Sequence, residues 1–198
     1  MDQVEPVGRR RELLDAADRV VMREGPRASM NAIAAEAGVT KPILYRHFRD
    51  KGGLYQALAD RHIEDLLTDL RAALRTRGGL RARTEATIDA YLSVIEGRPQ
   101  VYRFLMDRAS IEDPDVRGQL NRFLRRLADE LADGIRTELS LGRDPGQLAV
   151  AWAHAIVGMV QGAGDWWLDE RRVSREQLVR QLSDLLWGDF ARRGGAPR

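Results

Sequence analysis

The sequence contains no cysteine, and among its 198 residues there are only two lysines and three histidines. Without cysteine, neither a disulfide framework nor a thiolate metal site can form. The histidines, His47, His62 and His154, form no HExxH pair, and the sequence holds no P-loop. His62 has Asp65 one turn away, but two ligands are too few for a tight metal site. We therefore expect no catalytic residue, no metal and no cofactor, and hence no enzyme.

One glycine-rich stretch offers an alternative interpretation as an enzyme. Residues 158–164, GMVQGAG, loosely resemble the glycine fingerprint of a dinucleotide-binding fold. That fingerprint follows a β-strand, whereas this stretch lies inside a predicted helix that no strand precedes. The stretch therefore gives the enzyme alternative little support.

Long apolar runs are also missing from the sequence. No run approaches the roughly 18 residues that a membrane-spanning helix needs, and the first ten residues lack the apolar centre of a signal peptide. We expect a soluble, cytoplasmic protein with no membrane partner. The formal net charge is only +2, so the position of the charges matters more than their sum.

What the sequence does contain is helical periodicity from end to end, which predicts an all-α fold. Apolar residues recur at spacings of three and four, as on the buried face of an amphipathic helix. Proline, glycine and capping residues mark the helix ends. Asp50 is predicted to cap the helix that follows it, and Ser174 and Gln177 are predicted to form a capping box. We expect helices over residues 9–24, 30–37, 41–48, 51–76, 81–96, 99–110, 114–140, 145–171 and 175–192.

The predicted helices change in character near Lys51, where we place a domain boundary. Before it the helices are short and joined by tight turns, and after it they are long and several are apolar on more than one face. We expect a flexible segment over residues 1–8, a first domain over 9–51, a second helical domain over 52–192 and a flexible tail over 193–198.

Residues 30–49 have the spacing of a helix-turn-helix. Ala34 stands where the two helices must cross, and Gly38, four residues later, stands where the turn favours a positive φ. Val39 and Leu44 provide apolar side chains that bury both helices. Ser29 is predicted to cap the first helix of the motif, and Thr40 to cap the second.

The second helix of such a motif enters the major groove, where its first residues meet base edges. Lys41 can donate to guanine or to a phosphate, while Pro42 and Ile43 can contact thymine methyl groups. The hydrogen-bond donors around them can reach phosphate oxygens, which fix the position of the protein on the duplex. The predicted DNA-binding residues are Ser29, Thr40, Lys41, Pro42, Ile43, Tyr45, Arg46, His47 and Lys51.

The composition supports this motif, because both lysines of the chain lie between residues 40 and 51, where four cations accompany one anion. Each residue also has a less specific interpretation. Tyr45 could be a core aromatic, His47 an ordinary surface histidine, and Lys41 and Lys51 solvated charges.

The stretch MNAIAAEAGVTKPILYRHFRDKGGLYQAL, residues 30–58, resembles the DNA-binding signature of the TetR family of transcriptional regulators. This resemblance implies that residues 9–51 form the DNA-binding domain and that residues 52–192 form a helical effector-binding and dimerisation domain. It implies base reading by Lys41, Pro42 and Ile43. It also implies backbone contacts by Tyr45, His47 and Lys51, with Thr40 and the start of the helix over residues 30–37 assisting. It also implies a homodimer on a double-stranded DNA operator. Gly52-Gly53 departs from the pattern and is expected to weaken the start of the following helix by about 1 kcal/mol per glycine.

The last two helices are the expected dimer interface. Small residues at positions 151, 155, 158 and 162 line one helix face, which allows another helix to approach closely. The final helix carries more apolar surface than one buried stripe requires. Together they could form a four-helix interface across a twofold axis. The alternative is that both helices pack only within their own chain.

The resemblance also implies an effector pocket, and its candidate lining residues are mostly apolar. We therefore expect an apolar or amphipathic effector, and by analogy a fatty acyl compound. His154 and Gln161 could orient a polar head group, although a core position for His154 is the simpler interpretation. A regulator or adaptor with no effector is the alternative. The candidate lining residues are Tyr91, Tyr102, Phe104, Met106, Phe123, Trp152, Met159 and Trp166.

Overall fold

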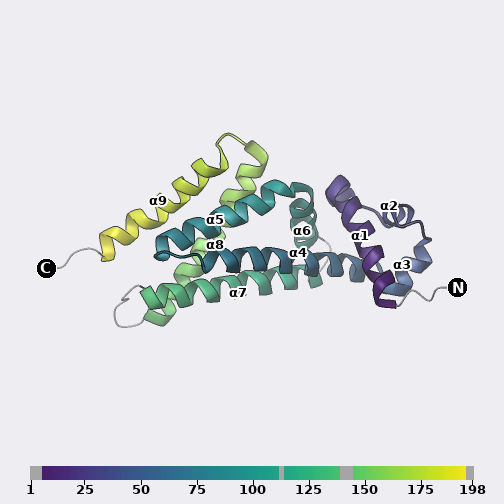
Figure 1. Ribbon diagram of the computed structural model, residues 1–198, viewed down its shortest axis with the longest axis horizontal. Helices are drawn as coiled ribbons and strands as arrows, with labels where there is room; N and C mark the ends of the chain where they lie inside the picture. Colours follow the sequence, from purple (N-terminus) through teal and green to yellow (C-terminus); the bar gives the residue numbers. More distant parts are fainter. Residues whose placement is uncertain (1–5, 112–113, 139–144, 195–198) are drawn as a thin grey trace. The chain divides into compact units, whose positions relative to one another are not determined.

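The computed structural model describes residues 6–111, 114–138 and 145–194, and in these residues the chain forms helices and no strand (Figure 1). The all-α prediction is confirmed. The elements are α1 (Pro6–Glu24), a 3-10 turn η1 (Gly25–Arg27), α2 (Met30–Glu36), α3 (Lys41–Phe48), α4 (Lys51–Leu74), α5 (Leu80–Gly97), α6 (Pro99–Ile111), α7 (Pro114–Glu138), α8 (Pro145–Glu170) and α9 (Arg175–Gly194).

The helix ends agree with the sequence signals to within a few residues. α1 begins three residues earlier than predicted and α9 ends two residues later, so helix extends into both segments that we expected to be flexible. The remainder of those segments, residues 1–5 and 195–198, lies outside the described residues, as do residues 139–144 around the predicted end of α7.

By its internal contacts the chain divides into two units. One comprises Met1–Glu64 and Arg98–Asn121, and the other comprises Asp65–Gly97 and Arg122–Arg198. α4 and α7 each contribute residues to both units. The boundary near Lys51 stays a prediction, because it was drawn from helix length and not from contacts.

The first unit has an apolar core to which α6 contributes. Val101 and Phe104 of α6 belong to the same buried cluster as Leu13 of α1, Leu44 of α3 and Leu58 of α4. α6 also packs closely on η1. A long-range contact therefore joins residues near position 100 to the three N-terminal helices.

The contact between η1 and α6 leaves no room for a side chain at Gly25. A Cβ atom there would lie 2.4 Å from Gln100 Oε1 and 3.3 Å from the Gln100 carbonyl oxygen. Gly25 also has a φ of +56°, which favours glycine. Gly25, which follows the end of α1, therefore also leaves the space in which α6 packs on η1.

In the second unit, α7 and α8 meet through small side chains. Ala128 and Ala132 of α7 lie in one buried cluster with Ala149 and Ala153 of α8, while larger residues such as Trp152 pack around them. Alanine at these positions lets the two helices approach closely, and the surrounding large side chains exclude water.

The turn between α8 and α9 is held by a buried tryptophan and a capping box. Trp167 donates from Nε1 to the Val173 carbonyl at 2.8 Å. The predicted capping box is confirmed: the Ser174 N–H donates to Gln177 Oε1 at 2.9 Å, and the Gln177 N–H donates to Ser174 Oγ at 3.2 Å. These bonds satisfy backbone groups that would otherwise be unpaired at the start of α9.

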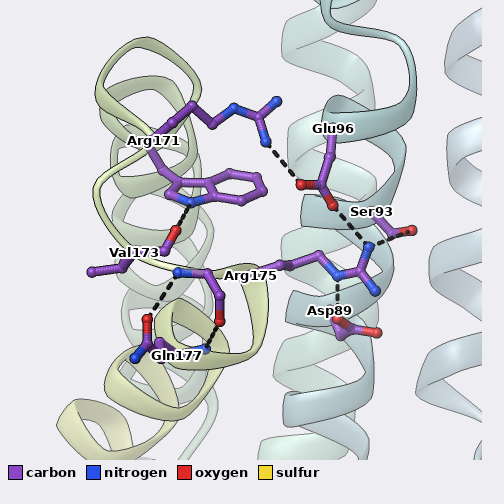
Figure 2. A network of polar contacts seen from close by, with 9 residues as sticks. Asp89, Ser93, Glu96, Arg171, Val173, Arg175 and Gln177 are labelled. Carbon is purple, nitrogen blue, oxygen red and sulfur yellow. Dashed lines mark hydrogen bonds and ion pairs between the residues drawn. The ribbon is translucent and has the colours of Figure 1, made fainter.

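Two arginines then fasten this turn to α5, as Figure 2 shows. Arg175 donates to Asp89 at 2.8 Å and to Glu96 at 3.0 Å. Arg171, whose guanidinium lies 4.4 Å from the Trp167 ring centroid, donates to the other Glu96 oxygen at 2.8 Å. α9 consequently runs along α5 with its first turn fixed by ionic bonds.

Candidate DNA-binding surface

The turn of the helix-turn-helix has the geometry that its glycine predicts. The Gly38 N–H donates to the Ala35 carbonyl at 3.1 Å, and the Val39 N–H donates to the Ala34 carbonyl at 3.0 Å. Gly38 has a φ of +62°. These two bonds with a left-handed glycine form a Schellman motif. Ala34 is buried at the crossing, as expected for a small residue there.

The two predicted helix caps have different outcomes. Ser29 caps α2 as predicted, since its Oγ accepts the Ala32 N–H at 3.2 Å. Thr40 occupies the cap position of α3, but its side chain makes no capping bond, so that part of the prediction is wrong. A capping side chain accepts from the second or third N–H of the helix. Here Pro42 has no N–H, and the Ile43 N–H donates to the Thr40 carbonyl at 3.0 Å.

α3 presents one face to solvent and buries the other. Leu44 and Phe48, one turn apart, are buried in the core of the first unit. Pro42, Tyr45 and Arg46 are exposed on the opposite side. Tyr45 is 38% exposed, so the alternative of a core aromatic is wrong.

The other predicted contact residues lie at the edges of this surface. Lys41, Ile43 and His47 are half-buried, while Ser29, Thr40 and Lys51 are exposed. All nine candidates come from the helix-turn-helix and the start of α4. We call these nine residues the α3 surface.

The charges of the first unit are distributed unevenly. On α1, Arg19 and Arg23 both donate to Glu36 of α2, at 2.8 and 3.3 Å. Hydrogen bonds from these two arginines lower the pKa of the Glu36 carboxyl. The ion pairs found among the described residues include none to Lys41 or Arg46. The α3 surface therefore keeps its positive charge, while the arginines beside α2 are neutralised.

The turn from α3 to α4 is tight and strained. Arg49 has φ +69° and ψ −59°, and the Asp50 N–H donates to the Phe48 carbonyl at 2.8 Å. This is a γ-turn, a backbone conformation that residues other than glycine rarely adopt. Asp50 then caps α4 as predicted, accepting the Gly53 N–H at 2.8 Å.

Position 53 requires glycine for a steric reason that the sequence did not reveal. A Cβ atom at this position would lie 2.1 Å from the Phe48 carbonyl oxygen. Glycine is therefore required to bring the start of α4 against the end of α3. The predicted weakness of this helix start stays a prediction, but Gly53 is a packing requirement as well as a poor helix former.

An internal ion pair connects α1 with α4. His62, almost fully buried, lies 2.8 Å from Asp18, measured from Nε2 to Oδ1. Burial alone would raise the pKa of Asp18, but the hydrogen bond from His62 and the positive charges of His62, Arg61 and Arg98 together lower it. Among the described residues, no group of three or more His, Asp or Glu side chains lies together around His62.

The residues predicted for an effector pocket are divided between the two units. Tyr102, Phe104 and Met106 lie in the first unit, and the other five lie in the second. Phe104 is fully buried, and its ring stands nearly perpendicular to that of Tyr55 with 5.1 Å between the centroids. It belongs to the core that holds the DNA-binding helices, so a core role replaces the pocket role that we predicted for it.

The candidates in the second unit also differ in their surroundings. Phe123 is buried, and Trp152 packs on the α7–α8 cluster, while Met159 is half-buried. Tyr91 faces α8, because its Cε1 would lie 3.0 Å from a Cβ atom built on Gly164. Trp166 is 48% exposed, and its place in a pocket stays a prediction.

His154 is exposed on α8, so the expected core position is wrong. The position of His154 along the helix is the sequence signal that could have predicted its exposure. His154 is adjacent to Ala155 and four residues before Gly158, two members of the predicted stripe of small residues. Those residues are also exposed in this chain.

Comparison with known families and proteins confirms the resemblance. Residues 13–58 match the family described as bacterial regulatory proteins of the tetR family, and residues 69–197 match the family described as tetracyclin repressor-like, C-terminal domain. The chain belongs to the TetR family of transcriptional regulators.

Relatives and solved structures cover nearly the whole chain. It is 32% identical over 184 residues to the HTH-type transcriptional activator FasR of Mycolicibacterium smegmatis, covering 92% of this chain and 83% of that protein. A transcriptional regulator from Rhodococcus sp. Rha1 has a TM-score of 0.76 at 19% identity, covering 95% of this chain and 99% of that one. FadR from Bacillus subtilis, solved in complex with stearoyl-CoA, has a TM-score of 0.70 at 19% identity, covering 89% and 96%.

Membership in the TetR family decides the general function. The protein is a DNA-binding transcriptional regulator and not an enzyme. Within the described residues, no helix has both the length and the apolar character that crossing a membrane requires.

We predict that Gly53→Ala destabilises this TetR-family protein by about 2–3 kcal/mol, because the new methyl group collides with a backbone oxygen that cannot move without breaking the γ-turn. Gly97→Ala is the matched control, since a Cβ atom there meets nothing within 4 Å. Its effect should stay within about 0.5 kcal/mol. Urea unfolding measures both. Equal effects of the two substitutions would contradict the steric role of Gly53.

Proposed function

We propose that this regulator binds a partly palindromic operator as a homodimer and that a small apolar or amphipathic effector controls its binding. The observation that carries the proposal is the α3 surface, whose residues are exposed or half-buried and which keeps its positive charge while neighbouring arginines are neutralised. A surface of this kind supplies both the phosphate contacts that give affinity and the side chains that can read bases.

The roles within the α3 surface follow from chemistry and position. Lys41, Pro42 and Ile43 form the first turn of α3, the part of a recognition helix that meets base edges. Arg46, one turn later, extends this line. The remaining five residues, Ser29, Thr40, Tyr45, His47 and Lys51, donate to phosphate oxygens and so set the position of the helix in the groove.

The exposed face of α8 supports a homodimer through the last two helices. Ala151, Ala155, Gly158 and Gly162 are all exposed, and a Cβ atom on either glycine would meet nothing within 4 Å. Large apolar side chains are exposed at both ends of this row on α8, namely Leu148 and Trp166, and α9 exposes Leu185. A face of small residues flanked by exposed apolar ones is suited to close packing against a second copy of itself.

A dimer also fits the proposed mode of DNA recognition. Two recognition helices related by a twofold axis can enter major grooves one helical turn apart on a palindromic site. An effector that binds better when the two helices are wrongly spaced shifts the population away from DNA. The reverse coupling follows if the effector favours the DNA-bound spacing.

We propose that the effector is an acyl-type compound. Supporting residues are the apolar candidates Tyr91, Tyr102, Met106, Phe123, Trp152 and Met159, which are buried or half-buried. Further support comes from the fold shared with FadR, which was solved in complex with stearoyl-CoA. A regulator without an effector is the alternative, and it predicts no response to any acyl compound.

The sign of regulation is proposed as repression, because a dimer seated on an operator that overlaps a promoter excludes the polymerase. The mycobacterial relative is described as an activator. Transcription from a promoter carrying the selected binding site distinguishes the two, since repression lowers the transcript level and activation raises it.

We predict that Lys41→Ala relaxes the preference for particular base pairs, costing about 1–3 kcal/mol at the positions it reads. Tyr45→Phe should weaken binding by about 1 kcal/mol at all sequences alike, because only a phosphate contact is lost. Binding across a randomised duplex library measures both effects. Arg172→Ala, on the α8–α9 turn, is the control and should change neither.

If both Lys41→Ala and Tyr45→Phe bind the library like the unmodified protein, the assignment of the α3 surface is wrong. If Lys41→Ala instead lowers only the salt dependence of binding, Lys41 contacts a phosphate and base reading belongs to other residues.

For the dimer we predict that Ala155→Arg shifts the protein to the monomer, because a long charged side chain prevents close approach of the facing helix. Ala72→Arg, an equivalent change at an exposed site on α4, should leave the oligomeric state unchanged. Sedimentation equilibrium measures both. A dimer that persists in Ala155→Arg with unchanged affinity would place the interface elsewhere.

For the effector we predict that stearoyl-CoA changes the affinity for the selected operator at least tenfold, about 1.4 kcal/mol of coupling. It should also raise the unfolding temperature, since it binds the folded state. Coenzyme A without the acyl chain is the control and should do neither. No effect of stearoyl-CoA in either measurement would favour the alternative without an acyl effector.

A further inference from the structure

The side chain of Arg10 lies over an aromatic ring at the end of the recognition helix. Its guanidinium carbon is 4.8 Å from the centroid of the Phe48 ring. Phe48 is the last residue of α3 and is buried in the core, while Arg10, on α1, is exposed. The ring therefore holds an exposed cation beside the end of α3.

The neighbouring Arg9 has a different environment. Arg9 donates to Glu12 at 2.7 Å, one turn along the same helix. No ion pair to Arg10 occurs among the described residues. Two consecutive arginines thus differ in charge balance, since the first is neutralised by a carboxylate and the second lies over a ring that carries no net charge.

A second cation is held in the same way on the other side of the α3–α4 turn. The Lys51 ammonium lies 5.4 Å from the centroid of the Tyr55 ring. Phe48 and Tyr55 belong to one buried cluster. The core of the first unit therefore holds two cations through its own aromatic faces, and one of them, Lys51, already belongs to the α3 surface.

We propose that Arg10 is a phosphate-contacting residue that extends the DNA-binding surface from the helix-turn-helix to the first helix. This inference rests on the proposed function, because it requires that the α3 surface faces DNA. Contact with the Phe48 ring leaves the polar edge of the guanidinium free to donate to phosphate oxygens. It also restricts the side chain before binding, which lowers the entropic cost of the contact.

The requirement is specific for arginine. A guanidinium can stack on a ring and donate two parallel hydrogen bonds to a phosphate at the same time. An ammonium has no planar face, so lysine at this position keeps the charge but loses the fixed geometry. The contact is one that positions the protein, because phosphates carry no sequence information.

The test measures how binding to a short mixed-sequence DNA duplex depends on salt. Arg10→Ala should reduce the slope of log K against log salt concentration by about 0.9, the amount for one phosphate. Arg9→Ala is the matched control and should leave the slope unchanged. Arg10→Lys should keep the slope but bind less tightly than the unmodified protein.

Thermal unfolding of the same variants separates a DNA contact from a structural one. If Arg10→Ala unfolds at a lower temperature yet keeps the full salt slope, the contact with Phe48 only stabilises the fold. That result would overturn the inference. An equal loss of slope in Arg9→Ala and Arg10→Ala would overturn it as well, because local charge alone would then explain both.

The failure of the proposed function gives a different result. In that case the unmodified protein would show no salt-dependent binding to the duplex, and the inference would fail with it. Salt-dependent binding that Lys41→Ala weakens and Arg10→Ala does not would overturn only the role of Arg10.

Discussion

The first unit depends on Tyr55, which brings three parts of the chain together. Its hydroxyl donates to the Ala28 carbonyl at 2.9 Å, between η1 and α2. Its ring stands nearly perpendicular to that of Phe104 from α6, and the Lys51 ammonium lies over its face. A buried tyrosine needs a partner for its hydroxyl, and the backbone before α2 provides one. Helices distant in sequence are thereby held around the helix-turn-helix.

Around that core the charges have separate roles. Buried or half-buried ion pairs such as His62–Asp18 connect α1 with α4, and the arginines beside α2 are neutralised by Glu36. The cations at α3 lie outside these pairs. Surface ion pairs contribute little to stability, so their main consequence here is electrostatic. They reduce positive charge beside α2 and so concentrate it where DNA is proposed to bind.

The second unit shows a comparable division between fixed and open faces. Arg175 and Arg171 fix the α8–α9 turn on α5, and alanines close the contact between α7 and α8. The opposite face of α8 carries small residues, and no described residue lies within 4 Å of a Cβ atom built on Gly158 or Gly162. If the proposed dimer forms through this face, α8 needs no further folding to accept a second helix, which keeps the entropic cost of association low.

The sequence by itself determined the helices, the Schellman turn at Gly38, the Ser29 and Asp50 caps and the exposed face of α3, because periodicity, capping and turn chemistry act over a few residues. Tertiary structure decided what depends on distant neighbours. Phe104 became a core residue through Tyr55, Gly53 was required by the Phe48 carbonyl, and Arg10 came to lie over Phe48. Each of the three depends on how two helices pack against each other, and no local sequence pattern predicts that packing.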